Sequence, residues 1–174
     1  MSAEMITYQP KSLIIEDWSH LQTSHFKPRG VWYSPVEGGK PSWRRWCEGE
    51  GFRRRYTHQY RLEVPYCSLS EALDGEGQGK VLLLETKGAV LEFAEEFQDD
   101  GGNSINWVVV AGLVSGIEIN PYQRALRWSG WYSWWDIPSG CIWKQPGALS
   151  LQEVPLDWDG SVEPPSWGSF TSDD

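Results

Sequence analysis

Asp136 is the residue of this chain whose neighbours point most directly to chemistry. The tryptophans nearest to it in sequence are Trp131, Trp134, Trp135 and Trp143. A carboxylate among so many indole rings would be partly desolvated, which is costly unless the group is hydrogen-bonded. Titratable groups in such surroundings cluster at functional sites. We therefore predict that Asp136 is a catalytic base or an electrostatic partner; the alternative is that it only caps a turn.

A second set of candidates lies in residues 30–34, with the sequence GVWYS, and in the segment after them. The set comprises Gly30, Trp32, Tyr33, Ser34, Ser42 and Trp43. Its hydroxyl groups could contact an amide or a ribose, and its rings could stack on a planar ligand. Because side chains of a strand alternate between two faces, Trp32 and Tyr33 cannot both face one pocket. The alternative for the tryptophans is packing in the core.

Glu118 is a second candidate acid. It lies between Ile117 and Ile119, in a pattern that predicts a strand. Its side chain then points to the opposite face from its neighbours, so the default prediction is a solvent-facing glutamate.

A basic stretch covers residues 40–61, where seven Lys and Arg face two Glu in a chain whose net charge is −9. Arg44, together with Arg45 and residues 53–55, could bind a pyrophosphate through bidentate contacts. A charge run is more often a solvated face. Nonspecific binding to duplex nucleic acid is not expected of an acidic chain.

The common signatures of nucleotide-binding loops, serine hydrolases and zinc proteases do not occur in the sequence. Cys47, Cys67 and Cys141 have no metal-ligand spacing, and there are only three His. We predict three reduced, structural thiols and no metal site. His20 or His25 could be catalytic, although both lie in a polar connection.

The order of the blocks resembles the ADP-ribosyltransferase superfamily. The resemblance rests on GVWYS, on Ser42-Trp43 with the aromatic helix that follows, and on WDIPSGCIW at residues 135–143. It implies that residues 30–43 form a wall for the nicotinamide of NAD, and that Asp136 takes the place where the family most often has Glu. It also places Tyr8, in residues 6–9, or less simply Ser19-His20, where the family usually has a His.

The activity implied is transfer of ADP-ribose from the substrate NAD to an unknown acceptor, or hydrolysis of NAD. A carboxylate that faces the positive charge developing on the ribose would lower the barrier. Two alternatives involve no chemistry. One is a Trp-rich module that binds a ligand; the other is an interaction or inhibitor protein whose acidic C-terminal segment binds a basic partner.

The elements that would hold these residues are short. Apolar patterns predict strands at residues 5–8, 31–33, 60–64, 81–84, 117–119 and 139–143. They predict helices from Ser42 as N-cap to residues 49–51, at 90–97, and at 104–114 with Ser104 as cap and Gly116 as C′ residue. A long strand at 105–110 is the alternative to the last helix. The predicted class is α+β, and the resemblance implies a split, mainly antiparallel sheet.

We predict one globular, NAD-binding-like domain at residues 1–150 and a poorly ordered tail at 151–174. The tail contains Pro, Trp and six acidic residues but no Lys or Arg, and Trp158 and Trp167 are its only expected anchors. The sequence has no apolar run of about 18 residues and no secretory signal. A cytoplasmic protein without membrane contact is expected.

Overall fold

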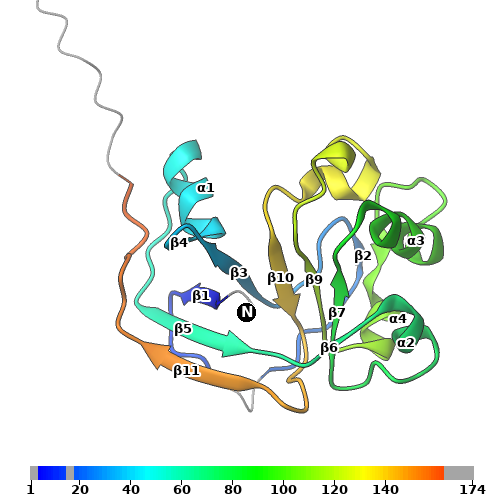
Figure 1. Cartoon of the computed structure of the whole chain (residues 1–174), viewed down its shortest axis with the longest axis horizontal. Helices are drawn as coiled ribbons and strands as arrows, with labels where there is room; N and C mark the ends of the chain where they lie inside the picture. The colour runs from blue at the N-terminus through cyan, green and yellow to red at the C-terminus, as the bar shows by residue number, and fades with distance from the viewer. Residues whose placement is uncertain (1–3, 15–17, 163–174) are drawn as a thin grey trace, which may run out of the picture.

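The apolar and aromatic runs of the sequence form a curled, mainly antiparallel sheet in the computed structural model, which describes residues 4–14 and 18–162 (Figure 1). Its strands are β1 (Met5–Gln9), β3 (Val31–Glu37), β4 (Lys40–Pro41), β5 (His58–Glu63), β6 (Tyr66–Cys67), β7 (Val81–Leu84), β9 (Gly116–Ile119), β10 (Ser139–Ile142) and β11 (Ser150–Val154). Their order is β11-β5-β1-β3-β10-β9-β7-β6, and β4 pairs with β3. Two of these pairs, β6 with β7 and β7 with β9, are parallel. A separate two-stranded sheet joins β2 (Ser24–His25) to β8 (Ile105–Asn106).

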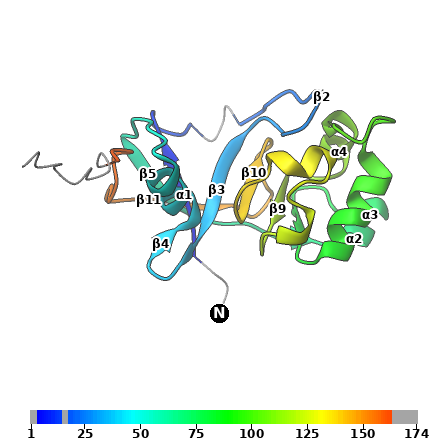
Figure 2. The ribbon, with the colours of Figure 1, turned by 90° about the horizontal axis from the view of Figure 1, so that it is seen from above.

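The longer helices lie in two places on the sheet. The helices are α1 (Ser42–Glu50), α2 (Leu69–Leu73), α3 (Lys87–Phe97), α4 (Trp107–Leu113) and two 3₁₀ turns, η2 (Arg124–Leu126) and η3 (Gly130–Trp134). Figures 1 and 2 show α2, α3 and α4 together near β6 and β7, whereas α1 lies apart from them, near β3 and β4. The molecule is therefore α+β, with short helices at one end and near the middle of one sheet.

The helix predicted at residues 104–114 is shorter than expected. Asn106, not Ser104, is its N-cap, because the Asn106 side chain accepts a hydrogen bond from the Val109 amide at 3.4 Å. The alternative of a long strand at 105–110 is wrong. Gly116 is not a helix cap but the first residue of β9, where a Cβ atom would lie 2.7 Å from the carbonyl oxygen of Cys141. Close packing of β9 on β10, and not a turn, accounts for this glycine.

The segment after residue 150 does not begin as a tail. Residues 150–154 form β11, which pairs with β5 and places Leu151 opposite Leu62. Trp158, an expected anchor, is buried against Tyr8 and Tyr56. The alternation in Leu151, Glu153 and their neighbours is too short and too polar to indicate a strand by itself, and pairing with β5 supplies the missing stabilisation. Trp167 lies outside the described residues.

Most of the aromatic side chains pack in the core. Six of the tryptophans are buried: Trp18, Trp107, Trp131, Trp135, Trp143 and Trp158. The three cysteines are also buried and unpaired with one another. In the part of the chain that the structure describes, no helix is both long and apolar enough to cross a membrane.

Glu118 is buried at the centre of the sheet, so the prediction of a solvent-facing side chain is wrong. Only 1% of the residue is exposed. Tyr33 of β3 and Tyr66 of β6 donate hydrogen bonds to its Oε2 at 2.8 and 2.6 Å, and the Asn120 amide donates to its Oε1 at 3.2 Å. These three donors satisfy the Glu118 carboxyl group, which strand alternation alone had predicted to face water.

The hydrogen bond from Tyr33 to Glu118 crosses an intervening strand. Gly140 of β10 pairs with Tyr33 on one side and with Glu118 on the other. The Tyr33 ring lies over Gly140, where a Cβ atom would overlap the ring. We call these three residues with Tyr66 the central clamp, because they join β3, β10, β9 and β6 on one face of the sheet.

Gly140→Ala is expected to destabilise the protein by about 1–3 kcal/mol, because the added methyl group overpacks a buried site. Urea unfolding measures the change. Gly112→Ala is the matched control, since a Cβ at this position in α4 meets no atom within 4 Å. Alanine there should keep or slightly raise stability. Equal effects of the two substitutions would contradict the packing described for the clamp.

Burial raises the pKa of Glu118, and its three hydrogen-bond donors oppose that rise only in part. The folded protein therefore holds this proton to a higher pH than the unfolded chain does. The Glu118 contribution to the free energy of unfolding should fall as the pH rises above the ordinary glutamate pKa of 4.5.

Glu118→Gln removes this titration but keeps an oxygen that accepts from both tyrosines. Wild type should therefore lose stability relative to Glu118→Gln between about pH 4 and pH 7. Urea unfolding of both proteins across that range measures the difference between their free energies of unfolding. Other groups titrate in both proteins, so their contributions cancel in this difference. Parallel stability profiles would show that Glu118 titrates as it does in the unfolded chain.

Candidate functional site

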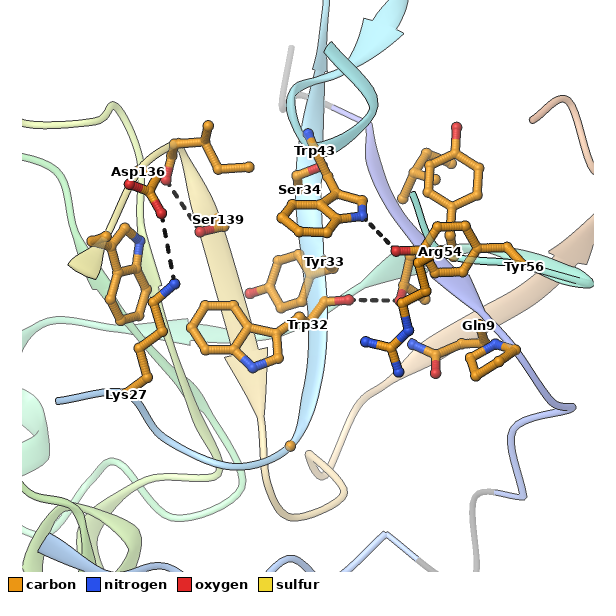
Figure 3. Close-up of a pocket in the computed structure, with 17 residues that line it drawn as sticks. Gln9, Lys27, Trp32, Tyr33, Ser34, Trp43, Arg54, Tyr56, Asp136 and Ser139 are labelled. Carbon is orange, nitrogen blue, oxygen red and sulfur yellow. Dashed lines mark hydrogen bonds and ion pairs between the residues drawn. The ribbon is translucent and has the colours of Figure 1, made fainter. Parts of the chain in front are cut away.

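A pocket of about 280 Å³ opens over β3, between α1 and the segment that leads into β10 (Figure 3). Its lining comprises Ile6, Thr7, Tyr8, Gln9, Pro10, Lys27, Gly30, Trp32, Tyr33, Ser34, Trp43, Arg54, Tyr56, Trp135, Asp136, Ile137 and Ser139. The volume is just below the range of about 300–1,000 Å³ usual for small-molecule sites. Asp136 thus borders the same pocket as the GVWYS segment, more than 100 residues away in the sequence.

The pocket lies where two neighbouring strands part. β1 pairs with β3 only at Met5 and Ile6 and then follows β5 as far as Gln9. At the point of separation the Thr7 hydroxyl donates to the carbonyl oxygen of Trp32 at 2.6 Å. This side-chain bond satisfies a carbonyl that loses its strand partner, so the sheet can open there without an unpaired buried acceptor.

One wall of the pocket carries two opposite charges. Lys27 Nζ lies 3.9 Å from Asp136 Oδ2 and 5.4 Å from the centre of the Trp32 ring. Burial lowers the pKa of Lys27, and the Asp136 charge opposes that effect. The Asp136 side chain is 49% exposed. The desolvation expected from the surrounding tryptophans is therefore not found, because the rings of Trp131 and Trp135 turn into the core.

The turn after Asp136 is stabilised by a different residue. Ser139 donates from its hydroxyl to the carbonyl oxygen of Ile137 at 3.1 Å. Among the described residues Asp136 accepts no hydrogen bond from the turn, and it forms an ion pair with Lys27. Its carboxylate oxygens are consequently open toward the pocket.

The opposite wall is aromatic and hydrogen-bonded. Trp43 of α1 donates from Nε1 to the Tyr56 hydroxyl at 2.8 Å, and Arg54 and Gln9 lie on the same side (Figure 3). Because the Tyr56 oxygen accepts from Trp43, its own proton remains available to a ligand. Arg54 supplies a cation on the side away from Lys27.

Trp32 and Tyr33 both border the pocket, but their side chains diverge as strand alternation requires. The Trp32 ring packs on Trp135, with centroids 5.1 Å apart. Tyr33 turns its hydroxyl to Glu118 in the central clamp. Trp32 is therefore the residue of this pair whose ring can contact a ligand.

Ser34 connects the pocket floor to α1. Its Oγ accepts a hydrogen bond from the Trp43 amide at 3.1 Å. Pro41 is the N-cap of α1 and gives no side-chain cap, so the prediction of Ser42 as N-cap is wrong. The Ser42 hydroxyl instead donates to Glu37 at 3.3 Å. The amide that a capping residue would normally satisfy is satisfied from β3, which fixes Trp43 above the pocket.

Three predicted site residues lie elsewhere. Ser42 and Arg44 are not among the lining residues, and neither is the alternative acid Glu118. Arg44 Nε donates to Glu48 at 2.9 Å, and its Nη1 lies 3.8 Å from Asp157. With two acidic partners, Arg44 is not placed to bind a pyrophosphate in this pocket. His20 and His25 do not line it either.

Tyr8 does line the pocket, at the position where the resemblance expects a His. Its hydroxyl donates to Asp157 Oδ1 at 2.9 Å. Burial raises the pKa of Tyr8, and its bond to Asp157 raises it further. Tyr8 is therefore a neutral wall residue, and its hydrogen is already committed to Asp157.

Sequence reasoning missed several lining residues with polar groups: Thr7, Gln9, Lys27, Tyr56 and Ser139. Of the basic run named at residues 53–55, Arg54 lines the pocket. Lys27 could have been suspected as an isolated lysine before Pro28. No local pattern distinguishes Thr7 or Tyr56 from ordinary strand and loop residues.

No cluster of three or more His, Cys, Asp or Glu able to hold a metal ion occurs within residues 4–14 and 18–162. One polar atom of the pocket lining is nevertheless unsatisfied. Trp135 Nε1 is buried without a hydrogen-bond partner among the described residues. A buried donor without an acceptor costs about 1–3 kcal/mol.

No protein-family model matches the chain, and neither a curated protein nor a solved structure matches it. The pocket is therefore the feature of this chain that bears on its function. Its chemistry combines a carboxylate, two cations and several ring faces within one small cavity.

Ser34→Ala is expected to lower the free energy of unfolding by about 0.5–2 kcal/mol, because it leaves the first turn of α1 without its acceptor. Chemical denaturation measures the loss. Ser70→Ala, within α2 and exposed, is the control and should change stability little. Unchanged stability of Ser34→Ala would mean that Ser34 does not hold α1.

Proposed function

We propose that the pocket binds NAD and that Asp136 assists cleavage of the bond between its nicotinamide and ribose, with transfer of ADP-ribose to an acceptor or to water. The observation that carries the proposal is the placement of Asp136 and GVWYS on one cavity. Two segments chosen for their residue types alone, far apart in the chain, contribute facing walls to it.

The sheet gives further support. The resemblance to ADP-ribosyltransferases implies a sheet that splits around the substrate. The parting of β1 and β3 after Ile6, directly beside the pocket, fits that expectation. The resemblance also implies an aromatic helix after the GVWYS strand, and α1 carries Trp43 at that place.

The chemistry needs little more than charge and position. When the bond from ribose C1′ to the nicotinamide nitrogen breaks, nicotinamide leaves with the bonding electron pair and positive charge develops on the ribose. The Asp136 carboxylate would stabilise that charge or accept hydrogen bonds from the ribose hydroxyls. The acceptor or water then forms the new bond to C1′ and loses its proton.

The remaining wall residues have roles in binding. Trp32 and Trp43 offer ring faces for the nicotinamide. Arg54 suits the phosphates, which the small volume of the pocket would leave near its opening. Lys27, at 3.9 Å from Asp136, is too distant for a strong hydrogen bond and orients the carboxylate through charge.

Asp136→Asn is expected to abolish most turnover while leaving NAD binding intact, because it removes the charge and keeps the shape. A loss of about 100-fold or more in nicotinamide release is expected for one preorganised electrostatic contact. NAD should still raise the melting temperature of the variant. Asp100→Asn, an exposed acid in the loop after α3, is the matched control and should behave as wild type.

A second candidate function is ligand binding without chemistry. It is favoured by the exposure of Asp136 and its pairing with Lys27, which suit a specificity contact as well as a catalytic one. NAD-induced stabilisation without nicotinamide release by wild type would support this second function. If NAD neither stabilises wild type nor releases nicotinamide, the proposal that the pocket binds NAD is wrong.

A role for the acidic C-terminal segment in binding a basic partner receives less support. Glu153 contacts His58 at 2.7 Å, and Asp157 accepts from Tyr8. Asp159 accepts from the backbone of Ser161. The three acids of this segment that the structure describes are thus engaged within the chain, and the other three lie outside the described residues.

A further inference from the structure

Three aromatic side chains form a stack beside the pocket: His25, Phe26 and Trp134, here called the rim stack. The ring centroids of Phe26 and Trp134 are 4.5 Å apart, and their planes differ by 23°. Lys27 follows Phe26 in sequence, Trp135 follows Trp134, and both of these next residues line the pocket. The rim stack therefore borders the wall that carries Asp136.

The rim stack is open to solvent in spite of its aromatic character. Trp134 is 54% exposed although Phe26 packs on it. The same segment carries Trp128, which is 82% exposed and has the Arg127 guanidinium 4.7 Å from its ring centre. Exposed rings grouped in this way mark binding surfaces more often than isolated apolar residues do.

The two segments that form the rim stack carry a net charge opposite to that of the whole chain. These segments, residues 18–30 and 120–136, contain Lys27, Arg29, Arg124 and Arg127. Asp136 is the one acidic residue in the described part of these segments. These two segments thus carry an excess of three positive charges, in a chain of net charge −9.

We propose that the rim stack, with Trp128 and its neighbouring cations, binds single-stranded nucleic acid. An unpaired base would stack on Trp134 or Trp128, and the adjoining phosphates would lie near Arg127 and Lys27. Stacking on ring faces requires unpaired bases, so a duplex cannot use this surface in the same way. The basic and aromatic composition favours this partner over an acidic peptide, which has no planar groups to stack.

The position of the rim stack makes the bound strand the acceptor, and this part rests on the function proposed above. A base nitrogen or a sugar hydroxyl beside Asp136 would form the bond to ribose C1′ as nicotinamide leaves with its electron pair. The proton of the acceptor passes to solvent. Binding itself requires no NAD, so it can be tested separately.

Fluorescence anisotropy of labelled oligothymidylate and oligouridylate, each about eight nucleotides long, tests the binding. Both single strands should bind more tightly than a duplex of equal length. Trp134→Ala and Trp128→Ala should each weaken binding at least about fivefold. Trp128 is so exposed that its removal cannot act through misfolding.

Arg127→Gln should reduce the slope of the logarithm of affinity against the logarithm of salt concentration by about 0.7, as expected for one phosphate contact to a single strand. The controls are Leu91→Ala, an exposed apolar residue of α3, and Lys87→Gln at the start of the same helix. Both should bind as wild type does.

Absence of binding at low salt, equal binding of duplex and single strand, or equal effects of Trp134→Ala and Leu91→Ala would overturn the nucleic-acid site. Binding that persists in a protein without NAD turnover would uphold this site and reject the transferase. Nicotinamide release with ADP-ribose attached to a protein, and no oligonucleotide binding, would uphold the transferase and reject this site.

Discussion

The hydrogen bond from Tyr33 to the buried Glu118 is the interaction on which the arrangement of this molecule depends most. β3 is the strand between β1 and β10, and the register joins it to each neighbour through only a few residue pairs. A carboxylate buried without donors would be very costly, so its position compels Tyr33 to reach across β10. Gly140 is the residue that lets the ring pass. The clamp thus fixes β3 on one face and leaves its other face for Trp32 and Ser34.

From that other face the pocket follows. Ser34 holds the first turn of α1, so the position of Trp43 is set from β3 and not from the helix itself. On the opposite side Trp32 packs on Trp135, which brings the next residue, Asp136, to the cavity. The positions of both walls of the pocket therefore depend on β3. A displacement of β3 would therefore change the separation between the Asp136 carboxylate and the rings of Trp32 and Trp43.

The sequence predicted those features that depend on local patterns. The strands at residues 5–8 and 81–84 and the helix at 90–97 have clear apolar periodicity, and all three occur, with small shifts of boundary. Features that depend on distant partners were not predictable. β11 becomes a strand only because β5 offers an edge, and Glu118 is buried only because tyrosines from two other strands meet it. For the same reason Arg44, whose partners include a residue more than 100 positions away, was misplaced in the site, whereas Lys27 was overlooked.

β11 also protects the rest of the sheet. It covers β5 over five paired residues, and without it β5 would present a row of unpaired amide and carbonyl groups to other chains. β11 is itself short and carries the exposed polar residues Gln152 and Glu153, which discourage further strand addition. The acidic strand β11, and not β5, is therefore the edge that this side of the sheet presents to other chains.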